Sequence, residues 1–151
     1  MTTITPFLWF DTQAEEAMNF YCSIFKDSKK LGVQRAGGNV ITASFELQGQ
    51  KFIGLNGGPQ FTFTEAVSFQ IIVETQQEVD ELWQKLMADG GAPSRCGWLK
   101  DKYGLSWQVV PQALPKLLSD PNPKRAGAAM QAMLQMDRIV IADLQKAADA
   151  A

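Results

Sequence analysis

The residues with the clearest potential for chemistry lie in one short stretch, CGWLKDKYGLSWQVVP, residues 96–111. Trp98 and Trp107, two of only 4 tryptophans in the chain, flank an Asp-Lys-Tyr-Gly turn there. Because side chains alternate along a strand, Gln108 must face away from Trp107. A glutamine amide both donates and accepts hydrogen bonds, so Gln108 is a candidate ligand-binding residue. The alternative is an ordinary strand residue whose amide bonds to its neighbours or to water.

Nucleophilic and metal-based catalysis are restricted because the chain contains no histidine. This excludes Ser-His-Asp and Cys-His arrangements and removes the commonest ligand of zinc and iron. Any metal ion would be held by carboxylates, amides or water, which favours magnesium or manganese. Cys96 follows Arg95, and a neighbouring cation favours a thiolate. Without a histidine base, however, a structural cysteine is the favoured interpretation.

The composition is that of an ordinary globular protein, and we expect it in the cytoplasm. Hydrophobic residues make up 46% of the chain and charged residues 20%. The 14 basic and 16 acidic residues give a net charge of -2, and no basic block forms, which argues against nucleic-acid binding. The N-terminus lacks a signal-peptide pattern, and no apolar run approaches the ~20 residues that cross a membrane. The 2 cysteines are far apart, as expected of free thiols in a reducing compartment.

Two parts of the chain repeat one pattern. An apolar run over residues 4–10 leads to Thr12 and Glu15, and a run over residues 67–73 leads to Thr75 and Glu78. Both pairs have the T-x-x-E form of a capping box, which predicts a helix start. The two predicted helices carry apolar stripes of identical spacing, Ala17, Phe20, Tyr21, Ile24 and Phe25 in one and Val79, Leu82, Trp83, Leu86 and Met87 in the other. The number of residues that separates the two capping-box motifs differs by one from the number that separates the two apolar stripes.

Antiparallel strands are predicted after each helix. Residues 41–47 alternate apolar and polar side chains and return over 51–56, and residues 98–100 return over 105–110 after the turn. Each half therefore contains a strand, a helix and two or three further strands, and its apolar sheet face has to be covered.

Beyond Pro111 the composition changes and helices are predicted. The apolar side chains there include Met130, Met133, Leu134 and Met136. They could form part of the core, a dimer interface or a stripe that binds other molecules, and the core and the dimer interface are favoured.

Four segments carry a family resemblance: ITPFLWFDTQAEEAMNFYCSIF, FELQGQKFIGLNGGP, CGWLKDKYGLSWQVVP and LLSDPNPKRAGAAMQAMLQM. The chain resembles the vicinal oxygen chelate superfamily, the glyoxalase/bleomycin-resistance/dioxygenase group, and within it the PhnB-like, demethylubiquinone methyltransferase-like branch. The resemblance implies an α+β fold of two βαβββ modules with curled, mixed or antiparallel sheets around a cavity, commonly completed by a second subunit. The expected boundaries are 1–63 and 64–112 for the modules and 113–151 for C-terminal helices, all within one structural domain.

The resemblance also places the metal ligands of metal-using members. By their pattern, the positions here are Thr5, Ser68, Gln108, where enzymatic relatives usually have glutamate, and either Ile53 or Asn56. Neutral hydroxyls and amides bind a divalent ion poorly, so we expect no firmly held metal. A methyltransferase would need a nucleotide-cradling glycine turn after the first strand, and none is visible, so methyl transfer is disfavoured.

The resulting hypothesis is a glyoxalase-like protein, a homodimer, that binds a small organic molecule in the cleft of its sheets without a cofactor. The candidate ligand-binding residues are Trp9, Ser68, Trp98, Gln108, Thr5 and Asn56. One alternative is a metal-assisted lyase, isomerase or oxygenase of the same superfamily. Another is an interaction protein whose methionine-rich C-terminal segment carries the function. Whether the protein is an enzyme stays open.

Overall fold

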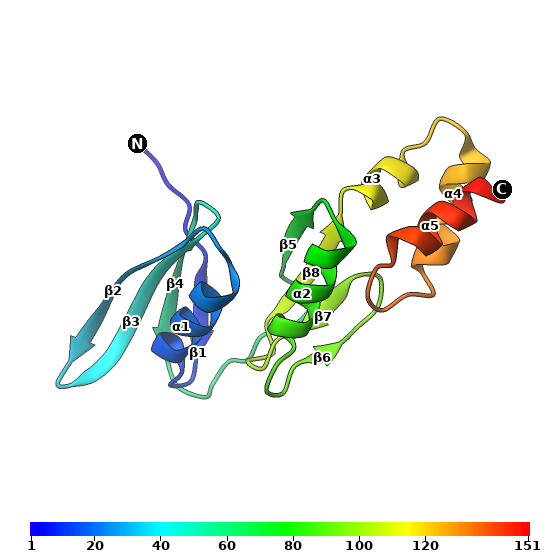
Figure 1. Ribbon diagram of the computed structural model, residues 1–151. Helices are drawn as coiled ribbons and strands as arrows, with labels where there is room; N and C mark the ends of the chain where they lie inside the picture. The colour runs from blue at the N-terminus through cyan, green and yellow to red at the C-terminus, as the bar shows by residue number, and fades with distance from the viewer. The chain divides into compact units, whose positions relative to one another are not determined.

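The chain divides into two compact units. The computed structural model describes residues 1–151, and the units are Met1–Phe63 and Thr64–Ala151 (Figure 1). Each unit contains one four-stranded open sheet with one helix across it, and the second unit also holds the C-terminal helices. The predicted α+β class with two βαβββ modules is confirmed.

The first unit is a mixed sheet in the order β1-β4-β3-β2, with β1 parallel to β4 and the other pairs antiparallel. One face is covered by the helix, which buries Ala17 and Tyr21 against strand residues such as Phe45 and Phe52. The elements are β1 (Phe7–Phe10), α1 (Ala14–Ile24), β2 (Ser28–Ala36), β3 (Asn39–Leu47) and β4 (Gln50–Asn56).

The second unit repeats this connectivity in the order β5-β8-β7-β6, with β5 parallel to β8. Its helix buries Val79, Trp83 and Leu86. The elements of the module are β5 (Ser68–Val73), α2 (Gln76–Leu86), β6 (Ala92–Pro93), β7 (Trp98–Lys100) and β8 (Ser106–Pro111). The strands predicted on both sides of the Asp-Lys-Tyr-Gly turn are therefore confirmed.

The two helix starts differ although their sequences look alike. The capping box of Thr75 and Glu78 forms as predicted, with both reciprocal hydrogen bonds. The box predicted for Thr12 and Glu15 is wrong, because α1 begins after Gln13, which makes no side-chain cap. Residues 11–13 join β1 to α1 whereas residues 74–75 join β5 to α2, so the first junction is one residue longer. This extra residue accounts for the differing offsets of the two repeats.

Asn56 replaces the missing cap from the end of β4. Its Oδ1 accepts a hydrogen bond from the backbone N–H of Ala14 at 2.8 Å. Its Nδ2 donates to the carbonyl of Val40 at 3.1 Å. A single amide thus satisfies a free donor at the first turn of α1 and ties the helix to two strands of the sheet.

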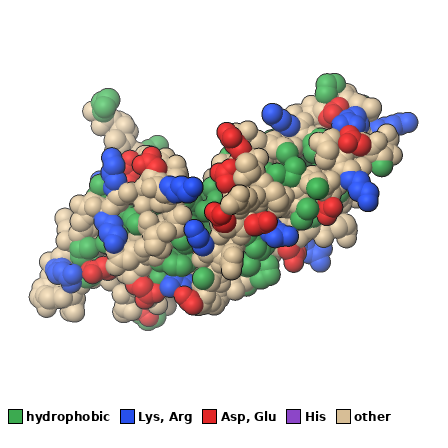
Figure 2. All heavy atoms as spheres, in the orientation of Figure 1, with side chains coloured by type: hydrophobic (Ala, Val, Ile, Leu, Met, Phe, Trp, Pro, Cys, Tyr) green, Lys and Arg blue, Asp and Glu red, His purple; other side chains and the backbone are tan.

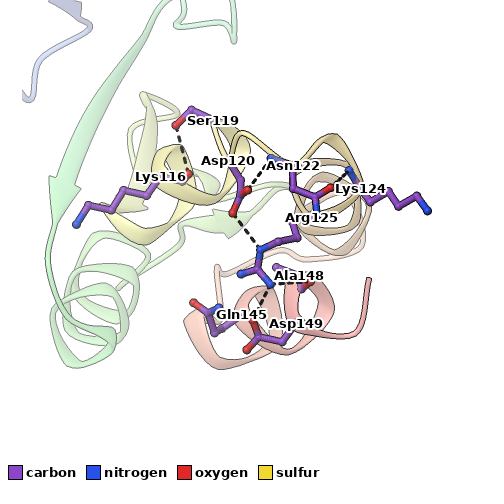
Figure 3. Close-up of polar contacts among 9 residues, drawn as sticks. All are labelled: Lys116, Ser119, Asp120, Asn122, Lys124, Arg125, Gln145, Ala148 and Asp149. Atoms are coloured by element: carbon purple, nitrogen blue, oxygen red, sulfur yellow. Dashed lines mark hydrogen bonds and ion pairs between the residues drawn. The ribbon is translucent and has the colours of Figure 1, made fainter.

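Three C-terminal helices complete the second unit: α3 (Ala113–Leu118), α4 (Pro123–Met133) and α5 (Ile141–Asp149). They share an apolar cluster with the end of β8, made of Val110, Leu114, Leu117, Ala129, Ile139, Leu144 and Ala148. Arg125 crosses from α4 to its neighbours and donates to the carboxylates of Asp120 and Asp149, both at 3.0 Å (Figure 3). The hydrogen bond from Arg125 lowers the pKa of Asp149. The methionine-rich stripe is divided, since Met133 packs on the cluster while Met130 is exposed.

Hydrogen bonds attach these helices to the second module. The side chain of Gln76 in α2 donates to the carbonyl of Ile139 at 2.9 Å and accepts from the N–H of Ile141 at 2.8 Å. The N–H of Cys96 donates to the carbonyl of Met136, also at 2.8 Å. Residues 113–151 are therefore an integral part of the second unit.

Charged side chains of both signs are spread over the surface. On the face drawn in Figure 2, basic and acidic side chains are interspersed and no continuous basic area forms. None of the helices combines the length and hydrophobicity needed to traverse a bilayer. Both cysteines are free thiols, and burial raises the pKa of Cys22.

We expect Asn56→Ala to destabilise the first unit by about 1–2 kcal/mol, because it leaves the Ala14 N–H and the Val40 carbonyl without their partner. Thr12→Ala, which would be costly if the predicted capping box existed, should change stability by less than about 0.5 kcal/mol. Amide hydrogen exchange in the first turn of α1, together with thermal unfolding, measures both. A larger loss in Thr12→Ala than in Asn56→Ala would contradict the assignment.

Candidate functional site on the open face of the second sheet

A buried carboxylate organises the hairpin of β7 and β8. Asp101 is 2% exposed, and its Oδ1 accepts hydrogen bonds from the N–H groups of Tyr103 at 2.9 Å and Leu105 at 3.0 Å. Its Oδ2 accepts from the indole Nε1 of Trp107 at 2.9 Å. A buried carboxylate needs donors and a buried indole needs an acceptor, so each satisfies the other. Gly104, at φ +85°, allows the chain to close the turn beneath them.

This arrangement fixes which side chains face the helix. Trp107 is 3% exposed and packs with Phe69, their ring centroids 5.7 Å apart. Leu99 is paired with Trp107 across the hairpin and is buried on the same face. Gln108 consequently lies on the opposite face, which α2 leaves uncovered.

We call this uncovered side of β5, β8 and β7 the open face. It carries Ser68, Gln70 and Ile72 from β5, Ser106, Gln108 and Val110 from β8, and Trp98 and Lys100 from β7. The strand register aligns them in rows, with Ser68, Ser106 and Lys100 in one row and Gln70, Gln108 and Trp98 in the next. Val110 belongs to the C-terminal apolar cluster, so that cluster bounds one end of the open face.

A hydrogen-bonded chain orients the amide of Gln108. Its Nε2 donates to the Oγ of Ser68 at 2.8 Å, and its Oε1 accepts a longer bond from the Nε2 of Gln70 at 3.4 Å. Both neighbours are therefore engaged, as the alternative interpretation of Gln108 expected. The Ser68 hydroxyl acts as an acceptor here, so its own hydrogen remains available to a further acceptor.

Ser106 is exceptional in this row. It is 1% exposed, and its Oγ is the only buried side-chain nitrogen or oxygen without a hydrogen-bond partner. Burying a polar group without a partner costs about 1–3 kcal/mol. Such a group in a folded protein calls for a specific explanation.

Lys100 supplies the charge of the row. Its ammonium forms an ion pair with the carboxylate of Glu65, which precedes β5. The hydrogen bond from Lys100 lowers the pKa of Glu65. The Lys100 side chain is 42% exposed and that of Glu65 58%, so solvent screens the pair and it adds little to stability.

The first unit has a different open face. There Phe7 and Trp9 of β1 lie in register with Ile53 and Leu55 of β4, an apolar surface. The indole Nε1 of Trp9 donates to the carbonyl of Gly58 at 2.8 Å, so its polar atom is engaged.

The six predicted ligand-binding residues do not form one group. The structure brings Ser68, Trp98 and Gln108 together on the open face of the second unit. Trp9 and Thr5 belong to the first unit, where Asn56 is turned to the helix side and holds α1.

Four residues of the open face were missed: Ser106, Lys100, Gln70 and Glu65. The first three lie two positions from a predicted residue on the same strand, so strand alternation alone could have indicated them. From the sequence, Glu65 was only one of three unpaired possible bases, with Glu46 and Glu74, and it reaches the face from outside the strands.

The donor set does not fit a firmly held divalent cation. Ser68, Gln108 and Thr5 offer neutral oxygens, and Ile53 offers none. No three histidine, cysteine, aspartate or glutamate side chains are grouped to hold an ion. Divalent cations require charged or strongly donating ligands.

We expect Asp101→Asn to destabilise the second unit by about 3 kcal/mol. The asparagine NH2 group would replace one carboxylate oxygen and face a hydrogen-bond donor, either the indole N–H of Trp107 or the backbone N–H groups of Tyr103 and Leu105. The exposed Asp137, whose side chain makes no hydrogen bond or ion pair, provides the control Asp137→Asn, which should be neutral within about 0.5 kcal/mol. Urea unfolding and the indole NMR signal of Trp107 report the two effects. An unchanged Trp107 signal in Asp101→Asn would contradict the structural role of the carboxylate.

Comparison with known proteins agrees with this fold. The family model described as 3-demethylubiquinone-9 3-methyltransferase matches residues 2–110. No curated protein matches the chain. The PhnB protein from Bacillus cereus is 40% identical, with a TM-score of 0.67 over 73% of this chain and 99% of that one.

Two more distant structures share the fold alone. They are a glyoxalase-related enzyme from Fulvimarina pelagi, with 15% identity and a TM-score of 0.54 over 76% of this chain and 90% of that one, and a glyoxylase/bleomycin resistance protein/dioxygenase domain from Frankia, with 17% identity and a TM-score of 0.51 over 74% and 92%. The predicted family resemblance is thus confirmed. It has the fold of the glyoxalase/bleomycin-resistance/dioxygenase proteins. The chain belongs to the family described as 3-demethylubiquinone-9 3-methyltransferase and is PhnB-like.

Proposed function

We propose that this protein binds a small organic molecule on the open face of its second unit, without a firmly held metal ion. The observation that carries the proposal is the unpartnered, buried hydroxyl of Ser106 beside the oriented amide of Gln108. Ligand-binding surfaces typically combine apolar area with a few placed polar groups. Trp98 and Ile72 supply the apolar area here.

Each residue of the face has a distinct role in the proposal. Gln108 is held by Ser68 and Gln70, so it presents its amide to a ligand in one orientation. Trp98 offers the large flat surface on which an apolar or aromatic part of the ligand packs. Thr5 and Trp9 are proposed as contacts for a ligand on the corresponding face of the first unit.

Methyl transfer is not part of the proposed function. Residues 11–13, which follow β1, contain no glycine and lead directly into α1, so the chain offers no nucleotide-cradling turn at this point. The metal-assisted alternative would need at least one carboxylate in place of Gln108 or Ser68.

We also propose that the protein is a cytoplasmic homodimer. Large apolar side chains are exposed on the single chain, among them Phe7, Ile72 and Met130, and a second copy would cover some of them. Light scattering during size-exclusion chromatography should give twice the chain mass. A single chain mass at micromolar concentration would contradict the dimer.

The binding proposal is tested by a ligand-observed NMR screen of small carboxylates, amides and phenols. We expect compounds that bind the wild type to bind Gln108→Leu about tenfold or more weakly, because this substitution removes the oriented amide. Gln77→Leu, an exposed change on α2, is the matched control and should retain every hit. Hits that survive Gln108→Leu unchanged, or that are lost equally in both variants, would contradict the proposal.

A further inference from the structure

Three hydrogen-bond donors are aligned across the open face. Ser68, Ser106 and Lys100 occupy one row on three adjacent strands, β5, β8 and β7. Neighbouring strands lie roughly 4.8 Å apart, so one small group can contact two of these side chains. Ser68 has a hydrogen to donate, Ser106 has no partner, and the Lys100 ammonium has three hydrogens. The row therefore offers more donors than the protein provides acceptors.

A carboxylate of the protein itself reaches this row. Glu65 lies in the segment before β5, outside the sheet, and its side chain forms an ion pair with Lys100. This pair shows that a carboxylate is accommodated at the Lys100 end of the row. It also leaves the buried Ser106 hydroxyl unsatisfied. Glu65 thus engages the charge of the row but not its buried donor.

We infer that the row of Ser68, Ser106 and Lys100 binds the carboxylate of a small organic acid, and that Glu65 occupies Lys100 until this ligand displaces it. The inference deepens the proposed function by naming the ligand class, and it rests on that function. The ligand's apolar part would lie on Trp98, which follows Lys100 on the same face of β7.

The exchange is favourable on physical grounds. An exposed ion pair contributes little stability, so releasing Glu65 into water costs little. The incoming carboxylate keeps a charge-assisted bond to Lys100 and adds one to the buried Ser106, and such bonds are stronger than neutral ones. Glu65 would then compete with every ligand for the Lys100 ammonium. A carboxylate would displace it, whereas neutral molecules, including protonated carboxylic acids, would not.

The test compares benzoate with its neutral isostere benzamide, followed through the amide NMR signals of β5, β7 and β8 at neutral pH. Benzoate should bind wild type more tightly than benzamide. Glu65→Gln should bind benzoate about fivefold tighter, and Lys100→Met about tenfold weaker. Lys100→Met should not alter benzamide binding by more than about twofold, because Glu65 keeps benzamide from the ammonium in the wild type. The exposed ion pair of Arg35 and Glu15 in the first unit provides the control Glu15→Gln, which should change nothing.

Ser106→Ala separates binding from folding. Removing an unpaired buried hydroxyl should leave thermal stability unchanged or raised, while weakening benzoate binding about fivefold. Benzamide bound as tightly as benzoate, with no response to Lys100→Met, would overturn the acid-specific inference and leave small-molecule binding standing. No signal change with either probe would overturn the inference, and the Gln108→Leu screen then decides the proposed function separately.

Discussion

The buried carboxylate of Asp101 is the interaction on which the second sheet depends. It collects two backbone donors of the turn and the indole of Trp107, so the hairpin closes in one register. A shift of one residue would turn every side chain of β8 to the other face and leave both the carboxylate and the indole unpaired. The position of Gln108 and Ser106 on the open face is thus a consequence of a bond made on the opposite side of the strand.

The two modules show how one topology supports two surfaces. Both have a parallel pair of strands, a helix on one face and an antiparallel hairpin. In the first unit the sheet face without a helix is apolar, with Trp9 and Leu55. In the second unit the corresponding face, the open face, is polar, with Ser68 and Gln108. The family match ends at residue 110, and the helices beyond it bound the polar face through Val110. Chemistry is therefore specified by a few alternating strand positions and not by the fold.

The fold was largely predictable because its signals are local. Strand alternation, the Thr75 capping box and the Asp-Lys-Tyr-Gly turn act over a few residues and appear in the structure where they were expected. The Thr12 box failed because the longer junction starts α1 at Ala14, and there a distant residue, Asn56, accepts a hydrogen bond from the Ala14 N–H. The site was only partly predictable, since the row of Ser68, Ser106 and Lys100 depends on register between three strands, which no single segment encodes.

The most direct test of the central claim is a high-resolution crystal structure of the protein grown with a bound small molecule, examined at Ser106 and Gln108. We predict that a polar atom of the ligand lies within hydrogen-bond distance of the Ser106 Oγ, with Gln108 still bonded to Ser68 and Asp101 to Trp107. Protein side chains that fill the open face and satisfy Ser106 would contradict the account. A cation coordinated tightly by Ser68 and Gln108 would contradict it equally.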